Sequence, residues 1–191
     1  MMSAKLTVIT GPMFSGKTGI LLWHARRAKI AELPVQVFVP ALDDRHGVGV
    51  VRSHDGMDLS EYGMGAWTIA AENVHALASR IRYEQALVLI DEAQFLPQDV
   101  VDQVRTILKK PRHVVIGGLS QDYLQRPFGP MPQLLAMADE VRVLTAICAD
   151  CRSEGASLTR KLGGTSAQIE LGSAALYAPL CRACYNRRDA A

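Results

Sequence analysis

Short apolar runs alternate along the chain with longer segments in which apolar and polar residues are mixed. Six such runs predict strands at residues 5–10, 35–40, 66–70, 86–90, 112–117 and 141–147. Four segments of helical composition lie between them, at residues 19–28, 72–83, 98–109 and 134–138. Strands that alternate with helices are typical of an α/β fold with a doubly wound parallel sheet. The uninterrupted run 86–90 indicates a central strand, because such strands are buried on both faces.

Two stretches break this rhythm. Residues 41–65 carry several Gly, Asp, His and Arg residues without a clear period, which predicts a long loop. Its length indicates either a functional role or disorder, and not a mere connection. Residues 148–191 lack the strand–helix alternation altogether. We therefore predict a main α/β domain over residues 1–147 and a small C-terminal unit over residues 148–191. With 49% apolar residues in a chain of 191, the main domain has enough material for a core.

The segment 11–18 carries the most specific motif of the main domain. It reads Gly-Pro-Met-Phe-Ser-Gly-Lys-Thr and fits the phosphate-binding pattern G-x-x-x-x-G-K-[ST] between a predicted strand and a predicted helix. Its glycines let backbone N–H groups converge on an anion at the helix N-terminus. The motif predicts that the chain binds a nucleoside triphosphate such as ATP. Its candidate ligands are Gly11, Pro12, Met13, Phe14, Ser15, Gly16, Lys17, which is expected to reach the β and γ phosphates, and Thr18, whose hydroxyl is expected to hold Mg²⁺.

An acidic pair follows the buried run 86–90. Asp91 stands where a strand of a parallel sheet ends, which is where ligands bind in such folds, and is expected to hold Mg²⁺ directly or through water. Glu92 comes next and is a candidate base. In an ATPase that base would orient a water molecule, and in a kinase it would take a proton from an acceptor hydroxyl. A structural role for Glu92, as a helix cap or in an ion pair, is the remaining interpretation.

All four cysteines lie in the C-terminal unit. Cys148 and Cys151 form one C-x-x-C pair, Cys181 and Cys184 form a second, and 29 residues separate the pairs. Four thiolates can close a tetrahedral Zn²⁺ site without an open position, which makes a structural zinc site the favoured interpretation. Two disulfides, a redox pair and a DNA-reading zinc module are the alternatives.

Charge and hydropathy narrow the class of protein. The formal net charge is +2, which argues against a protein whose main task is to coat nucleic acid. No apolar run approaches the length of a membrane span, and the N-terminal residues run into the first predicted strand without a signal peptide. Cysteines confined to one cluster fit a cytosolic protein with a metal site. We therefore expect a cytoplasmic protein that does not bind nucleic acid or a membrane.

Several of these segments together resemble the type II, cytosolic-type thymidine kinase family. The resemblance rests on the phosphate loop 11–18, the segment Asp-Glu-Ala-Gln-Phe at 91–95, the pieces Gly118-Leu119 and Pro127-Phe128-Gly129, and the paired cysteines in this order. It extends from about residue 5 to residue 187. It implies transfer of a phosphoryl group from ATP to the 5′-hydroxyl of thymidine or deoxyuridine, a step of nucleotide salvage for DNA synthesis.

The resemblance also implies roles for single residues near the phosphates. Glu92 matches the family's general base, and Asp91 and Gln94 match positions in the nucleotide and Mg²⁺ site. Asp43 and Arg45 match a segment near the phosphates, which would make the loop 41–65 a lid. A plain exposed turn is the alternative interpretation of Asp43 and Arg45.

A nucleoside pocket is the next feature that the resemblance implies. The zinc would anchor both ends of a lasso, residues 152–180, whose main chain around 169–172 reads the base while Tyr177 covers sugar and base. For each apolar member taken alone, ordinary core packing is the more common role. The implied pocket residues are Met13, Phe95, Leu119, Tyr123, Thr159, Ile169, Glu170, Leu171, Gly172 and Tyr177.

The chain departs from the family pattern at three points. Ser120 stands where the family often has Asp, Tyr123 where it usually has Phe, and the spacer from Cys151 to Thr159 is one residue longer than the bacterial pattern. None of these departures affects the phosphate loop, Glu92 or the cysteines. The resemblance further implies a homotetramer and feedback by dTTP.

A second class of protein shares most of these motifs. A small P-loop ATPase with a zinc module, acting on nucleic acid or on a partner protein, would have the same Lys17, Asp91 and Glu92 but no nucleoside pocket. A nucleotide-binding switch with negligible turnover is a third possibility. Transfer of phosphate to thymidine, against DNA-stimulated phosphate release, distinguishes the first two.

Overall fold

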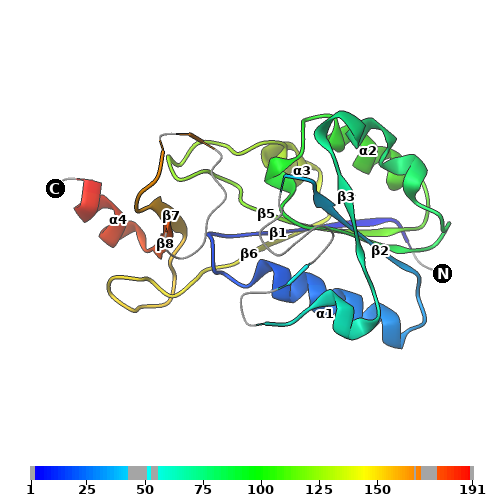
Figure 1. Ribbon diagram of the computed structural model, residues 1–191, viewed down its shortest axis with the longest axis horizontal. Coiled ribbons are helices and arrows are strands. Elements are labelled where there is room, and N and C mark those ends of the chain that lie inside the picture. The colour runs from blue at the N-terminus through cyan, green and yellow to red at the C-terminus, as the bar shows by residue number, and fades with distance from the viewer. Residues whose placement is uncertain (1–2, 43–50, 53–55, 166, 169–175, 190–191) are drawn as a thin grey trace.

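A sheet of six parallel strands forms the centre of the molecule (Figure 1). The computed structural model describes residues 3–42, 51–52, 56–165, 167–168 and 176–189. Within these residues the strand order is β3-β2-β4-β5-β1-β6, and every neighbouring pair is parallel. The predicted α/β class is confirmed. The strands are β1 (Lys5–Thr10), β2 (Val35–Pro40), β3 (Ala66–Ile69), β4 (Leu87–Ile90), β5 (His113–Gly118) and β6 (Glu140–Val143).

Helices cover both faces of this sheet. Helix α1 (Lys17–Ile30) packs on one face, and α2 (Val100–Ile107) and α3 (Met131–Met137) lie on the other (Figure 1). Each face has its own hydrophobic cluster: Leu21 and Val115 belong to the cluster on the α1 side, Val104 and Ile116 to the other. All four residues of β4 are buried, as expected for a strand covered on both sides. No helix in the described part of the chain is long and apolar enough to cross a bilayer.

Most predicted elements differ from the structure only by a few residues at their ends, and two differ further. The predicted helix 72–83 is instead a pair of 3₁₀ helices, η2 (Ala71–Ala76) and η3 (Ala78–Arg80). The break lies where the side chain of Gln103, on α2, accepts the backbone N–H of Ala78 at 3.1 Å, so this N–H is directed to a tertiary partner. The last strand ends at Val143 and not at residue 147, because Ala146 pairs with Ala156 in an antiparallel bridge. The chain thereby turns from the sheet toward the C-terminal unit.

The predicted long loop and the acidic segment contain short helices that sequence periodicity did not indicate. A 3₁₀ helix, η1 (Leu59–Tyr62), lies within 41–65, and another, η4 (Ala93–Phe95), follows the acidic pair. Asp58 caps η1, because its carboxylate accepts the backbone N–H of Ser60 at 2.8 Å and also binds Arg52. The predicted loop therefore contains local structure where it packs against α1.

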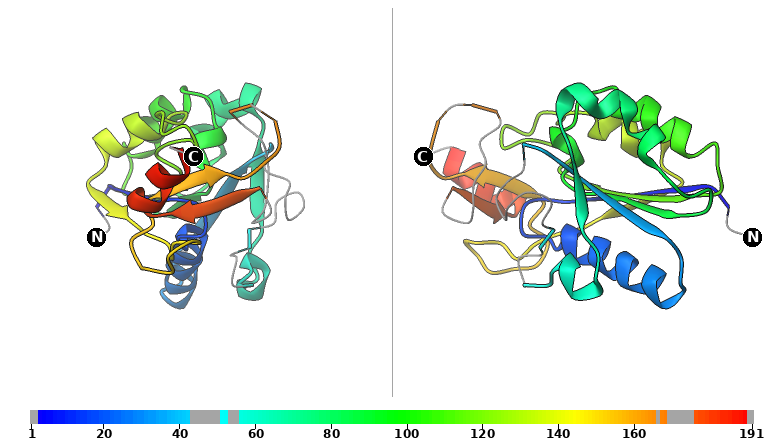
Figure 2. Two further views of the ribbon diagram at one scale, coloured as in Figure 1. Left: turned by 90° about the vertical axis from the view of Figure 1, so that its left-hand side faces the viewer. Right: turned by 45° about the vertical axis from the view of Figure 1, so that its right-hand side comes forward.

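The C-terminal segment builds a small separate cluster at the carboxyl edge of the sheet (Figures 1 and 2). It consists of the antiparallel strands β7 (Leu158–Lys161) and β8 (Tyr177–Leu180) and helix α4 (Arg182–Asp189). The Tyr185 hydroxyl donates to the carbonyl of Tyr123 at 2.8 Å, and Gln121 Nε2 donates to the carbonyl of Ser157 at 3.3 Å. The cluster is thus attached to the loop that follows β5.

Gly129, next to the acidic segment, has a backbone that only glycine fits. Its φ is +52°, and a Cβ there would lie 2.2 Å from the carbonyl oxygen of Gln94. We predict that Gly129→Ala lowers the free energy of unfolding by about 2–4 kcal/mol, through left-handed strain plus a main-chain clash. Urea unfolding measures the loss.

Gly155→Ala is the matched control, because Gly155 also has a positive φ but nothing lies within 4 Å of the position that its methyl group would take. Only the conformational cost, about 1–2 kcal/mol, should appear there. Equal losses at the two positions would contradict the proposed clash with Gln94.

Candidate active site

The phosphate loop connects β1 to α1, as predicted. The loop approaches the chain after β6 so closely that a Cβ on Gly11 would lie 2.6 Å from the carbonyl oxygen of Leu144. Lys17 opens helix α1 and is buried. Its Nζ donates to the carbonyls of Pro12, at 2.7 Å, and Gly11, at 3.3 Å. The ammonium group therefore points into the loop, where it would meet a bound phosphate.

Asp91 lies beside the loop at the end of β4. It is 5% exposed, and the Thr18 hydroxyl donates to its Oδ2 at 2.8 Å. Burial, and next the neighbouring charge of Glu92, raises the pKa of Asp91 to about 6. A carboxylate and a hydroxyl oxygen at this distance are hard donors that suit Mg²⁺. The pair Thr18–Asp91 thus fits the predicted magnesium ligands, and a cation there would favour the charged carboxylate.

Glu92 has a left-handed backbone, with φ 50° and ψ 40°, which is unusual for a residue with a side chain. Its N–H donates to Asp91 Oδ1 at 2.9 Å. This conformation turns the chain after β4, where the short helix η4 begins. Strained backbone of this kind is common at functional positions.

Gln94 lies on η4 and links Glu92 to the next strand. Its Nε2 donates to Glu92 Oε2 at 2.5 Å, and its Oε1 accepts the backbone N–H of Leu119 at 3.0 Å. The resemblance places Gln94 in the nucleotide and Mg²⁺ site. In the structure its amide contacts the candidate base, one residue beyond the candidate magnesium ligand Asp91.

The C-terminal unit reaches directly into the phosphate loop. Thr159, on β7, accepts the backbone N–H of Met13 through its hydroxyl oxygen at 3.0 Å. The structure therefore brings Thr159 and Met13 together, as predicted, despite the longer spacer after Cys151. One hydrogen bond connects the predicted substrate side of the site to the phosphate side.

Aromatic residues gather next to this contact. The Lys161 ammonium lies 4.9 Å from the ring centre of Tyr123 and 6.0 Å from that of Tyr177, so the two predicted pocket residues flank one cation. Phe95 packs edge-to-face on Phe128, with ring centres 5.8 Å apart. The aromatic residues predicted for a nucleoside pocket thus lie around the carboxyl edge of β5 and the start of β8.

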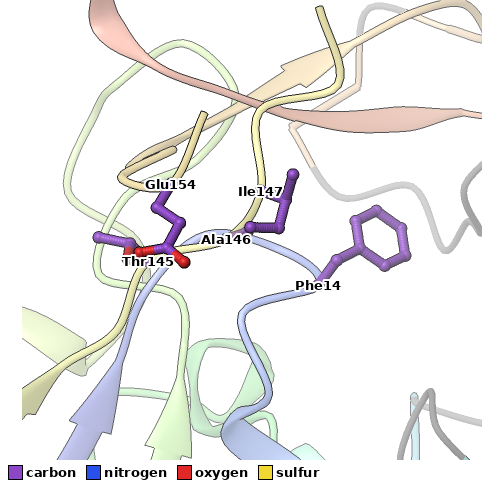
Figure 3. A pocket seen from close by; sticks show the side chains of 5 residues that line it. All are labelled: Phe14, Thr145, Ala146, Ile147 and Glu154. Carbon is purple, nitrogen blue, oxygen red and sulfur yellow. The ribbon is translucent and has the colours of Figure 1, made fainter. Parts of the chain in front are cut away.

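A hollow of about 290 Å³ lies on the other side of the phosphate loop, near the end of β6. Figure 3 shows the Glu154 carboxylate beside Thr145 at one end and the ring of Phe14 at the other. Phe14 has a positive φ, which turns its side chain outward from the tip of the loop. Phe14 is thus the one residue of the motif that lines this hollow; the remaining lining residues are Thr145, Ala146, Ile147 and Glu154.

The four cysteines converge as the sequence predicted. Their Sγ atoms all lie within 4.8 Å of one another, and all four are free thiols. A tetrahedral zinc with Zn–S bonds of about 2.3 Å needs sulfur atoms about 3.8 Å apart. The Sγ atoms of Cys151 and Cys181 are 3.8 Å apart. The group therefore fits a metal ion held by thiolates.

Hydrogen bonds around the cysteines favour the charged form of one of them. Burial alone would raise the pKa of Cys148, but backbone N–H groups, that of Cys181 first, lower it to about 6. The N–H of Cys181 donates to the Cys148 Sγ at 3.4 Å, and Arg187 donates to the Cys184 Sγ at 2.9 Å. Such donors are typical of thiolates bound to a metal.

Some predicted site residues lie outside the described residues. These are Asp43, Arg45, Ile169, Glu170, Leu171 and Gly172, so their roles stay predictions.

The structure adds two residues that sequence reasoning missed. Asp122 is buried, and its carboxylate accepts hydrogen bonds from Gln168 Nε2, at 2.8 Å, and from the backbone N–H groups of Leu124 and Arg126. Lys161 donates to the carbonyls of Thr165 and Ala167. A charge inside the polar segment 120–126 could have drawn attention to Asp122.

Comparison with known proteins bears on the chemistry of this site. The family model described as thymidine kinase matches residues 4–185. A thymidine kinase of Bacteroides thetaiotaomicron is 40% identical over 185 residues, which cover 96% of this chain and 87% of the relative. A thymidine kinase of Pseudothermotoga lettingae is 33% identical over 186 residues, which cover 97% of each protein. With a match across nearly its whole length, this chain belongs to the thymidine kinase family.

Proposed function

We propose that this chain transfers the γ-phosphoryl group of ATP to the 5′-hydroxyl of thymidine, and of deoxyuridine, in nucleotide salvage. The observation that carries the proposal is the acidic pair at the end of β4, where Asp91 binds Thr18 of the phosphate loop and Glu92, with a left-handed backbone, accepts a hydrogen bond from Gln94. Family membership favours this function over an ATPase with a zinc module.

Each step of the transfer has a candidate residue. Lys17 and the N–H groups of the loop hold the β and γ phosphates, and Thr18 and Asp91 hold Mg²⁺ when it is bound; Mg²⁺ neutralises charge on the phosphates. Glu92 accepts the proton of the 5′-hydroxyl as that oxygen forms its bond to the γ-phosphorus. The bond between the γ-phosphorus and the bridging β-phosphate oxygen breaks, and the electron pair of that bond leaves with ADP.

We propose the lasso, residues 152–180, as the nucleoside-binding element. Thr159 and Tyr177 belong to its two strands, and Thr159 touches the phosphate loop. In this proposal Tyr177 covers the sugar and base, and main-chain groups of residues 169–172 read the donor–acceptor edge of thymine. Met13, Phe95, Leu119 and Tyr123 complete an apolar slot.

We further propose that the four cysteines hold one structural Zn²⁺ and that residues 148–191 act as a unit around it. Four thiolates leave no open position, so such a zinc would take no part in the reaction. It would fix both ends of the lasso, because one cysteine pair precedes β7 and the other follows β8.

We also propose a cytoplasmic homotetramer under feedback by dTTP. The support for association is the edge strand β6, whose Val141 and Val143 are 45% and 72% exposed. A sheet edge with exposed valines is a surface that a second copy can cover. dTTP would present its thymine edge to the lasso and its phosphates to the loop at 11–18.

Glu92→Gln tests the general base. The variant should bind ATP and thymidine with little change in KM but lose about 10²–10⁴-fold in kcat, because the amide cannot accept the hydroxyl proton. Transfer of radiolabel from ATP to thymidine measures this. Glu84→Gln, at an exposed glutamate paired with Lys110, is the matched control. A Glu92 variant that keeps more than about half of the wild-type kcat would rule out this role.

Elemental analysis of the purified protein tests the metal, and one Zn²⁺ per chain is expected. Cys181→Ser should raise the KM for thymidine more than the KM for ATP, because the metal fixes the lasso and not the phosphate loop. Ser79→Ala, at an exposed serine of η3 in the main domain, is the control. Metal-free protein with intact disulfides would refute the site, and equal damage to both KM values would mean that the metal supports the whole fold.

Tyr177→Ala tests the nucleoside pocket. A stacked aromatic residue is worth roughly 1–3 kcal/mol in nucleic-acid sites, so the KM for thymidine should rise about ten- to hundredfold while the KM for ATP stays unchanged. Tyr177→Phe keeps the ring and should behave nearly as wild type. An unchanged KM for thymidine in the alanine variant would mean that the thymine base does not bind against Tyr177.

A further inference from the structure

Gln94 is a buried polar side chain with two specific partners. It is 2% exposed, and its amide spans from Leu119 at the end of β5 to Glu92 at the end of β4. A buried amide that makes both of its bonds to well-ordered partners is held in one position, since a lost bond would leave a buried polar group unpaired.

The orientation of the amide follows from its partners. The backbone N–H of Leu119 can only donate, so it requires the oxygen, Oε1, on its side. The NH₂ group must then face Glu92, where Nε2 lies 2.5 Å from Oε2. If the amide were rotated by 180°, Nε2 would face the Leu119 N–H and Oε1 would face the Glu92 carboxylate. Donor would then face donor and acceptor would face acceptor, so both contacts would be repulsive.

Two glycines shape the space that Gln94 occupies. A Cβ on Gly118 would lie 2.9 Å from Gln94 Oε1, and a Cβ on Gly129 would lie 2.2 Å from the carbonyl oxygen of Gln94. The side chain and the backbone of this residue are thus enclosed from β5 and from the loop before α3. Glu92 precedes η4 with a left-handed backbone, and its carboxylate lies within hydrogen-bond distance of Gln94, two residues further on.

We propose that Gln94 is a positioning residue that fixes the carboxylate of Glu92 for its encounter with the acceptor hydroxyl. The inference rests on the proposed function, in which Glu92 is the base. A bond from Nε2 to one carboxylate oxygen sets the plane of the group, and the Leu119 backbone anchors that bond to the sheet. Leu119 itself belongs to the proposed nucleoside slot. The same backbone segment therefore positions both the general base Glu92 and the slot.

This role differs from a place in the nucleotide and magnesium site. A ligand of Mg²⁺ or of the phosphates would act on ATP, and its loss would change the KM for ATP or the requirement for Mg²⁺. A residue that acts only through Glu92 changes kcat and leaves those quantities alone.

Gln94→Glu replaces the amide donor by a like charge. A carboxylate at this position can still accept from the Leu119 N–H and has nearly the same shape, but it repels the Glu92 carboxylate unless the two share a proton. A misplacement of about 1 Å can cost about 10²-fold, so we expect kcat to fall by about that factor. In the neutral variant Gln94→Met, the KM values for ATP and thymidine and the Mg²⁺ dependence should stay within about twofold of wild type.

Gln94→Met removes the donor without adding a charge and should lower kcat by a similar factor. Gln98→Met is the matched control, because exposed Gln98 donates to the carbonyl of Gly129 in the same loop but does not touch Glu92. Thermal unfolding of all variants checks the fold. If Gln94→Met does not fold, the result of Gln94→Glu decides.

The double variant Glu92→Gln/Gln94→Glu provides the decisive comparison. If Gln94 acts through Glu92, the second substitution should lower kcat no further than Glu92→Gln alone. An additional loss of about 10²-fold in the double variant would overturn the proposal, since the two residues would then act independently. So would a raised KM for ATP or a raised Mg²⁺ requirement in the neutral variant Gln94→Met.

The failures of the two proposals can be told apart. A strongly impaired Glu92→Gln together with fully active Gln94 variants overturns the positioning role and leaves the base intact. A fully active Glu92→Gln overturns both, because no base then remains for Gln94 to position.

Discussion

Parallel pairing of β4, β5 and β1 is the constraint on which the site depends. Thr10 is in register with Gly118, and Ile90 with Ile116, so the three strands end at one edge. The phosphate loop, the acidic pair and the segment from Leu119 onward therefore leave the sheet side by side, although about a hundred residues separate the first from the last. Buried strands hold this edge in place, because each is packed on both faces.

Charge at this edge is costly and is balanced by close partners. Asp91 is buried beside Glu92, and its pKa is raised by burial first and by that neighbour second. The compensation comes from the Thr18 hydroxyl and from the buried ammonium of Lys17. Such a site gains most from a bound cation and from the phosphates that accompany it. The electrostatics thus favour a complex of nucleotide and metal over either alone.

The C-terminal unit has a hydrophobic cluster of its own, and hydrogen bonds join it to the main domain. The sheet has its own clusters, and the cysteines belong to a third cluster with β7, β8 and α4. Thr159 bonds to Met13 in the phosphate loop, and Tyr185 bonds to the carbonyl of Tyr123. Gln121 and Asp122, after β5, also bond to Ser157 and Gln168. The C-terminal unit thus contacts both the phosphate loop and the segment after β5, and a metal ion held by its cysteines would stabilise that unit.

The sequence by itself determined the α/β class, the phosphate loop, the acidic pair and the cysteine group, because each is a local pattern of residue types at fixed spacing. Tertiary structure decided the rest. Gln103 on α2 accepts the Ala78 N–H at the break between the two 3₁₀ helices, and no local propensity encodes that contact. The partners of Gln94 likewise depend on Leu119 and Gly129, which lie 25 and 35 positions away. Packing of β4 against β5 brings Leu119 to the Gln94 amide, and the loop before α3 brings Gly129 to the Gln94 carbonyl oxygen. A spacing rule read along one chain cannot express either contact.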